Sequence, residues 1–97
     1  MKTLEELRQI LSPQKKILCD TYQISDLRIF GSYAKGEQTE SSDVDFLVDY
    51  ETAPTLINLV ELREHLSKLL ELKVDVVTKN ALKPHIREQI LEESTYI

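Results

Sequence analysis

The apolar residues of the chain follow a helical period at its start. Spacings of three and four residues predict a first amphipathic helix through Leu4, Leu7, Ile10 and Leu11. Ser12 and Pro13 then have the character of an N-cap and a first helical residue. They predict a second helix that begins there and runs through Ile17 and Leu18.

Three short apolar runs further along the chain predict strands at residues 27–30, 44–48 and 74–77. Between the second and third runs, Thr52-Ala53-Pro54 predicts the start of the longest helix. The core-facing stripe of that helix is predicted at Leu56, Leu59, Val60, Leu66, Leu69 and Leu70. Residues 80–84 lead into a last helix, whose apolar positions are Ile86, Ile90 and Leu91.

The element order, ααβ(α)βαβα, predicts an α/β (α+β) fold with a small mixed sheet of three to four strands flanked by helices. A helical crossover between the second and third strands favours a parallel, right-handed connection. The direction of the first strand pair stays open, because a shorter segment joins those two strands. No repeat, low-complexity tract or linker divides the chain, so we expect a single domain over residues 1–97.

The composition limits the class of protein. No apolar run approaches the roughly 20 residues of a membrane helix, and residues 1–6 are acidic rather than signal-like. Cys19 is the only cysteine, so we expect no internal disulfide and a reducing cytoplasm. The net charge of −5, without a dense Lys/Arg patch, argues against stable binding of nucleic acid. It does not exclude a nucleotide, because metal ions and backbone amides can hold its few phosphates.

Both glycines of the chain fall in one short segment, Gly31-Ser32-Tyr33-Ala34-Lys35-Gly36-Glu37. Glycine permits a positive φ and lets another group approach the backbone closely. Between a strand end and a short helix, Gly31 and Ser32 can direct backbone N–H groups and a hydroxyl at a phosphate. Taken alone, this pair also fits a plain strand-to-helix turn.

Three aspartates lie in or beside the predicted strands. Asp43 and Asp45 project from one strand face, because strand side chains alternate, and Asp75 stands among valines. Two carboxylates about 4 Å apart repel by roughly 4 kcal/mol at an effective dielectric of about 20. A divalent cation removes that cost, and oxygen ligands favour Mg²⁺. The alternative makes Asp43 a cap or turn residue and Asp75 an exposed partner of a lysine.

Together these residues resemble a known signature. Gly31-Ser32, Gly36-Glu37, Ser42-Asp43-Val44-Asp45 and Asp75 resemble the G-S-x-A/S-R/K-G-E … S/T-D-x-D … D pattern of the DNA-polymerase-β-like nucleotidyltransferase superfamily. The length, the helix order and the Leu82-Lys83-Pro84…Ile90-Leu91 ending are similar to its minimal nucleotidyltransferase (MNT) group. Lys35 stands where many members have arginine. It keeps the positive charge but lacks the bidentate guanidinium fork.

The resemblance implies a catalytic site and a metal cofactor. Asp43 and Asp45 would hold two Mg²⁺ ions, and Asp75 would complete the site and take the proton of the acceptor. The nucleotide-binding residues would be Gly31, Ser32, Lys35 and Gly36, with ATP as the substrate.

The resemblance also implies a partner. MNT proteins act as antitoxins of a HEPN-domain ribonuclease, with which they form hetero-oligomers, and they transfer AMP to a tyrosine of that toxin. Two alternatives stay open: a non-catalytic module that neutralises its partner by occlusion, or a nucleotidyltransferase for a small hydroxylated molecule.

The remaining candidate residues are assigned to packing or surface. His65 and His85 are expected in solvent, and Cys19 in a half-buried position. Tyr33 lies inside the motif, where it would border the nucleotide, whereas Tyr22, Tyr50 and Tyr96 are expected to pack.

Overall fold

The sheet has four strands in the order β3-β2-β1-β4, in a computed structural model that describes residues 1–97. Strand β1 (Ile24–Phe30) is antiparallel to both β2 (Val44–Tyr50) and β4 (Thr95–Tyr96), and β2 is parallel to β3 (Val74–Thr78). The mixed α/β sheet and the parallel crossover pair predicted from the sequence are confirmed. Strand β4 was not predicted, because two residues are too few to form a pattern.

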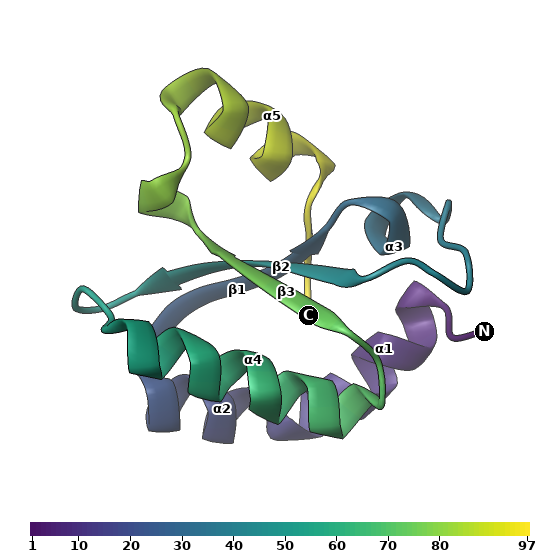
Figure 1. Cartoon of the computed structure of the whole chain (residues 1–97), viewed down its shortest axis with the longest axis horizontal. Coiled ribbons are helices and arrows are strands. Elements are labelled where there is room, and N and C mark those ends of the chain that lie inside the picture. The colour runs from purple at the N-terminus through teal and green to yellow at the C-terminus, as the bar shows by residue number, and fades with distance from the viewer.

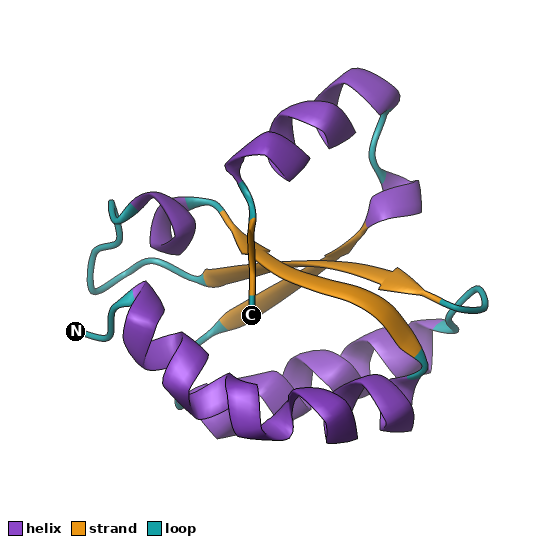
Figure 2. Ribbon diagram, turned by 180° about the vertical axis from the view of Figure 1, so that it is seen from behind, coloured by secondary structure: helices purple, strands orange, loops and turns teal.

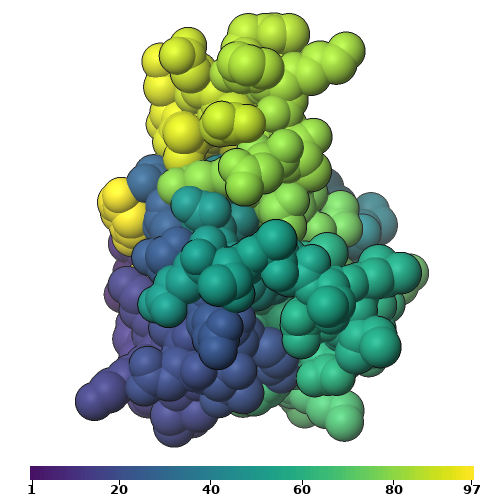
Figure 3. Space-filling model, turned by 90° about the vertical axis from the view of Figure 1, so that its left-hand side faces the viewer, coloured from purple at the N-terminus to yellow at the C-terminus, as the bar shows by residue number.

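The helices lie on both sides of this sheet. Figures 1 and 2 show α1 (Leu4–Leu11), α2 (Lys15–Tyr22) and α4 (Leu56–Leu70) on one face, and α5 (Pro84–Glu93) on the other. The short α3 (Ser32–Lys35) joins β1 to β2, and 3₁₀ turns occupy Ser12–Gln14 and Lys79–Ala81. Figure 3 shows these layers from the side, with the C-terminal residues at one end and the N-terminal helices at the other. None of the helices is long and apolar enough to cross a membrane.

The main core lies between the sheet and helices α1, α2 and α4. In β2, the alternating residues Val44, Phe46 and Val48 are fully buried in this core, and Leu27 and Ile29 of β1 lie beside them. The helices contribute one leucine per turn: Leu7, Leu11, Leu18, Leu62, Leu66 and Leu70. Because strand side chains alternate, Asp45 and Leu47 point to the other face, which carries α5. The core therefore fixes which face of the sheet holds the acidic residues.

The helix starts differ from the sequence-based predictions. Ser12 does not cap a second helix, because the chain continues through a 3₁₀ turn and α2 begins at Lys15 without a side-chain cap. Helix α4 is capped by Thr55 rather than by Thr52. Thr55 and Asn58 form a capping box in which each side chain bonds the other's backbone N–H, at 3.1 and 3.0 Å. The prediction was wrong by three residues because residues 51–54 form a loop.

The predicted stripe of α4 was also partly wrong. Leu56 and Val60 are 76% and 40% exposed, whereas Leu62, Leu66 and Leu70 are fully buried. At about 100° per residue, Val60 lies about 160° round the helix from Leu62. The exposed residues therefore belong to the solvent side of the helix and not to its core side.

Candidate active site

Gly31 turns the chain from β1 into α3. It has φ +74° and ψ −149°, a conformation that only glycine adopts without strain. A β-carbon here would lie 3.2 Å from Cγ of Asp45 and closer still to its Oδ2. Both the backbone conformation and the close approach of Asp45 therefore require glycine at position 31. Its backbone lies directly against the Asp45 carboxylate.

Helix α3 is a single turn closed by the second glycine. The N–H of Lys35 donates to the carbonyl of Gly31 at 3.2 Å, and the N–H of Glu37 donates to that of Ser32 at 2.9 Å. Gly36 ends the turn in the left-handed region, with φ +72°. The motif thus places Ser32 at the first position of α3, beside the acidic strand end.

The aspartates come from neighbouring positions of two parallel strands. Asp45 of β2 and Asp75 of β3 are partners in the strand register, and Asp43 lies just before β2. Asp45 is half-buried, while Asp43 and Asp75 are exposed. The structure therefore brings Asp45 and Asp75 side by side at the Gly31 turn. It shows Asp75 without the lysine partner of the alternative reading, since neither its side chain nor that of Asp43 forms an ion pair.

The three carboxylates also repel one another, and the repulsion changes the pKa of Asp45. Burial raises the pKa of Asp45 above its ordinary value, and the negative charges of Asp75 and Asp43 raise it further. Both effects disfavour the ionised form. A cation bound beside Asp45 would offset this cost.

The donor set fits a magnesium ion that is shared with a substrate. No three carboxylate, histidine or cysteine side chains already enclose a common point. Mg²⁺ is commonly bound through one or two carboxylates, with substrate phosphates and water completing its octahedron. Asp45 and Asp75 in register, with Asp43 nearby, supply such carboxylates and leave the remaining positions open.

Comparison with known proteins identifies the family. A sequence model described as nucleotidyltransferase domain matches residues 11–97. The chain belongs to this family. One relative, protein adenylyltransferase MntA of Thermococcus cleftensis, is 45% identical over 97 residues that cover all of this chain and 98% of MntA. Nucleotidyltransferases of this family are typically metal-dependent.

Solved structures agree with this assignment. A minimal nucleotidyltransferase structure is 36% identical, with a TM-score of 0.86 over 99% of this chain and 97% of its own. A chain from the complex of an MNT antitoxin with tri-AMPylated HEPN toxin of Shewanella oneidensis has a TM-score of 0.67 at 20% identity. The match covers 92% of this chain and 70% of the Shewanella oneidensis chain, and the two chains share the fold. The family, fold and enzyme class predicted from the sequence are confirmed.

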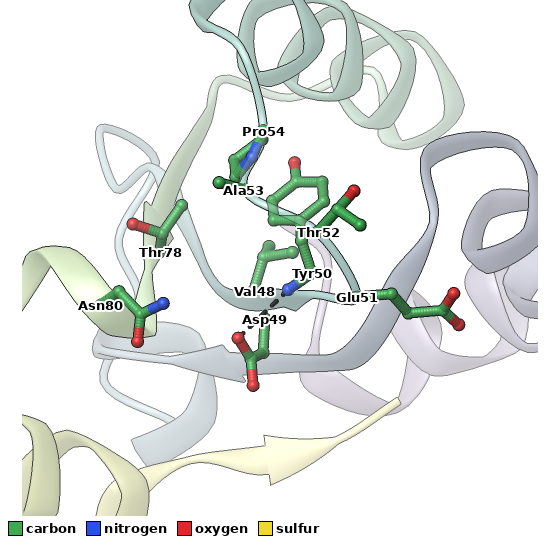
Figure 4. A pocket seen from close by; sticks show the side chains of 9 residues that line it. All are labelled: Val48, Asp49, Tyr50, Glu51, Thr52, Ala53, Pro54, Thr78 and Asn80. Carbon is green, nitrogen blue, oxygen red and sulfur yellow. Dashed lines mark hydrogen bonds between the residues drawn. The ribbon is translucent and has the colours of Figure 1, made fainter.

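The candidate acidic site and the cavities of the structure overlap only at Asp43. The cavity of about 280 Å³ in Figure 4 lies at the other end of β2, where it is lined by residues 48–54, Thr78 and Asn80. Two further cavities, of about 240 and 380 Å³, lie beside Asp43, and Asp43 and Lys73 line both of them. No cavity is therefore lined by Asp45 or Asp75.

Three residues outside the acidic cluster differ from their predicted positions. Tyr33, which was expected to border the nucleotide, is 2% exposed and belongs to the core, so its side chain offers almost no surface to a ligand. His65 is half-buried rather than solvated, and its Nδ1 lies 3.0 Å from the Tyr22 hydroxyl. Tyr96 is 58% exposed, with the guanidinium of Arg28 4.1 Å from its ring centre.

Other predictions of this kind agree with the structure. His85 is exposed, and Cys19, Tyr22 and Tyr50 are half-buried. The residue that sequence reasoning missed is Glu93, which pairs with Lys35 of the motif at 3.4 Å. No local sequence signal marks this pair, because its two members come from distant parts of the chain.

Proposed function

We propose that this nucleotidyltransferase is a protein adenylyltransferase that transfers AMP from ATP to a tyrosine of a HEPN ribonuclease and thereby silences it. The observation that carries the proposal is the register pairing of Asp45 with Asp75 beside the backbone of Gly31. Similarity to MntA over the whole chain supports the choice of AMP and of a protein acceptor.

Each site residue has a role in the proposed reaction. Asp43, Asp45 and Asp75 would hold two Mg²⁺ ions, which when bound neutralise the triphosphate and stabilise the attacking and leaving oxygens. Gly31 and Ser32 bind the β- and γ-phosphates through backbone N–H groups and a hydroxyl, and Gly36 lets the α3 turn close around them. Lys35 adds a positive charge at the end of that turn.

The transfer itself is a displacement at the α-phosphorus. The tyrosine oxygen forms the new bond to phosphorus in line with the bond that breaks, and pyrophosphate leaves. Asp75 takes the phenolic proton, since its exposed carboxylate can approach the incoming hydroxyl.

The absence of a cavity at Asp45 and Asp75 supports a protein acceptor. A small hydroxylated molecule would need a pocket beside Asp45 and Asp75, and neither residue lines the cavity at residues 48–54 or the two cavities beside Asp43. A partner protein brings its own surface around the tyrosine. The adduct would add charge and bulk where RNA must bind, which would silence a ribonuclease.

The direct test combines the purified chain, the HEPN protein and ATP with Mg²⁺. The expected result is an intact mass of the HEPN protein increased by whole AMP units, together with loss of RNA cleavage. The Asp43→Asn/Asp45→Asn variant should fold, as judged by circular dichroism, and produce neither effect. Equal silencing by that variant, or silencing without nucleotide, would instead identify an occluding antitoxin.

A further inference from the structure

The motif lysine is paired across the molecule with the end of the last helix. Nζ of Lys35, the last residue of α3, lies 3.4 Å from Oε2 of Glu93, the last residue of α5. Both helices lie near the same end of the sheet, where the α5 end descends toward α3 (Figure 1). Lys35, the one basic residue of segment 31–37, is therefore already engaged in an ion pair.

The segment after α5 holds Glu93 in this position. The guanidinium of Arg8 donates to the Thr95 hydroxyl, and that of Arg28 donates to the Tyr96 hydroxyl at 2.5 Å. Strand β4 adds its pairing with β1. Glu93 is therefore held near Lys35 by neighbours that do not depend on the ion pair itself.

The ion pair contributes little to folding. The side chains of Lys35 and Glu93 are 42% and 36% exposed, and exposed pairs typically contribute at most about 1 kcal/mol. A triphosphate carries several negative charges and can displace a single carboxylate from an ammonium group. The same carboxylate then lies close to bound phosphates, which it repels.

We propose that Glu93 competes with the ATP phosphates for Lys35 and so weakens nucleotide binding by the free protein. This inference rests on the proposed function, because it needs Lys35 to contact the triphosphate. It assigns to the C-terminal end of α5 a role in setting the affinity for ATP. Glu93 itself is a positioning residue and takes no part in bond formation.

The test measures binding of the α,β-methylene analogue of ATP, which the enzyme cannot cleave, with Mg²⁺ by calorimetry. Glu93→Gln should lower the Kd by about two- to fivefold, the range of an exposed ion pair. Glu92→Gln, the matched control, removes the same charge from an exposed neighbour that has no ion pair, and should leave the Kd unchanged. In a Lys35→Gln background, Glu93→Gln should lose most of its effect.

The outcomes separate this inference from the proposed function. A Kd for Glu93→Gln equal to that of Glu92→Gln, or a higher one, would overturn the role of Glu93 while AMP transfer continues. A transfer rate that falls at saturating ATP without a change in Kd would also overturn it, since Glu93 would then act in the chemical step. No binding of the analogue by either the wild-type protein or Glu93→Gln, together with no AMP transfer to the HEPN protein, would overturn both proposals.

Discussion

The backbone of Gly31 lies so close to the carboxylate of Asp45 that a β-carbon at position 31 would be 3.2 Å from Cγ of Asp45. This contact joins the turn that is proposed to bind phosphate to the strand that is proposed to bind metal. Asp75 extends the contact by its register pairing with Asp45. Asp45 therefore has the Gly31 turn on one side and Asp75 of β3 on the other.

Substitution of Gly31 should be costly for both folding and transfer. Gly31→Ala places a β-carbon in a conformation reserved for glycine, which costs about 1–3 kcal/mol, and forces Asp45 to move. The expected result is a loss of stability in urea unfolding and loss of AMP transfer. Gly36→Ala is the control for stability, because its φ of +72° is similar but open space surrounds it. An equal, small cost at both positions would contradict the close approach.

Asp45 should destabilise the metal-free fold at neutral pH. Because its pKa is raised in the folded protein, the native state binds more protons than the unfolded chain between the unfolded and the folded pKa. Stability therefore falls as pH rises through that window, and the whole loss is present above the folded pKa. In EDTA at about pH 7, Asp45→Asn should therefore have a higher Tm than the wild type. The difference should vanish as pH falls to the unfolded value of about 3.9. A lower Tm for the variant at neutral pH would contradict this account.

Asp26 should have the opposite pH dependence. Burial raises its pKa, but hydrogen bonds and charge from Lys79 and Arg28, at 2.5 and 3.0 Å, outweigh burial and lower it overall. Asp26 therefore stabilises the fold above the unfolded pKa of about 3.9, and this stabilisation is lost as pH falls through the folded pKa. Asp26→Asn should cost about 1–2 kcal/mol at neutral pH.

The measurement is urea unfolding of the wild type and Asp26→Asn across the acidic range. The difference in unfolding free energy between the two proteins should shrink as the pH is lowered. A constant difference would mean that the hydrogen-bond geometry, and not the charge, supplies the stabilisation.

Thr55 should control the start of α4. Thr55→Ala removes the side chain that accepts from the Asn58 N–H at 3.1 Å, and the loss of such a cap costs about 1 kcal/mol. Thr52→Ala, three residues earlier, removes no cap and should change the midpoint of thermal unfolding little. A larger loss of stability for Thr52→Ala than for Thr55→Ala would instead place the cap at Thr52, as the sequence predicted.

The relative position of Asp45 and Asp75 follows from local rules that can be applied to the sequence. Strand alternation places Asp45 opposite the buried Val44 and Phe46, and the crossover rule makes β2 and β3 parallel. Two aspartates at similar positions of parallel neighbours then lie side by side. The roles of Asp43, Asp45 and Asp75 in catalysis and metal binding remain predictions.

Long-range contacts could not be predicted in the same way. The burial of Tyr33 depends on how α3 packs against the core, and the Lys35–Glu93 pair depends on where α5 ends. Neither the burial of Tyr33 nor the Lys35–Glu93 pair follows from the periodic spacing of apolar residues in the sequence. The misplaced stripe of α4 has a simpler cause: several leucines at helical spacing fit more than one helix face, and only the observed packing selects Leu62, Leu66 and Leu70.

The most direct test of the central claim is to determine which phosphorus of ATP reaches the acceptor. Parallel reactions with ATP labelled at the α- or the γ-phosphorus, with Mg²⁺ and the HEPN protein, should label that protein only from the α-position. Asp45→Asn should abolish the label. Label from the γ-position would identify a kinase reaction, and absence of label from a folded protein bound to its partner would contradict nucleotidyl transfer.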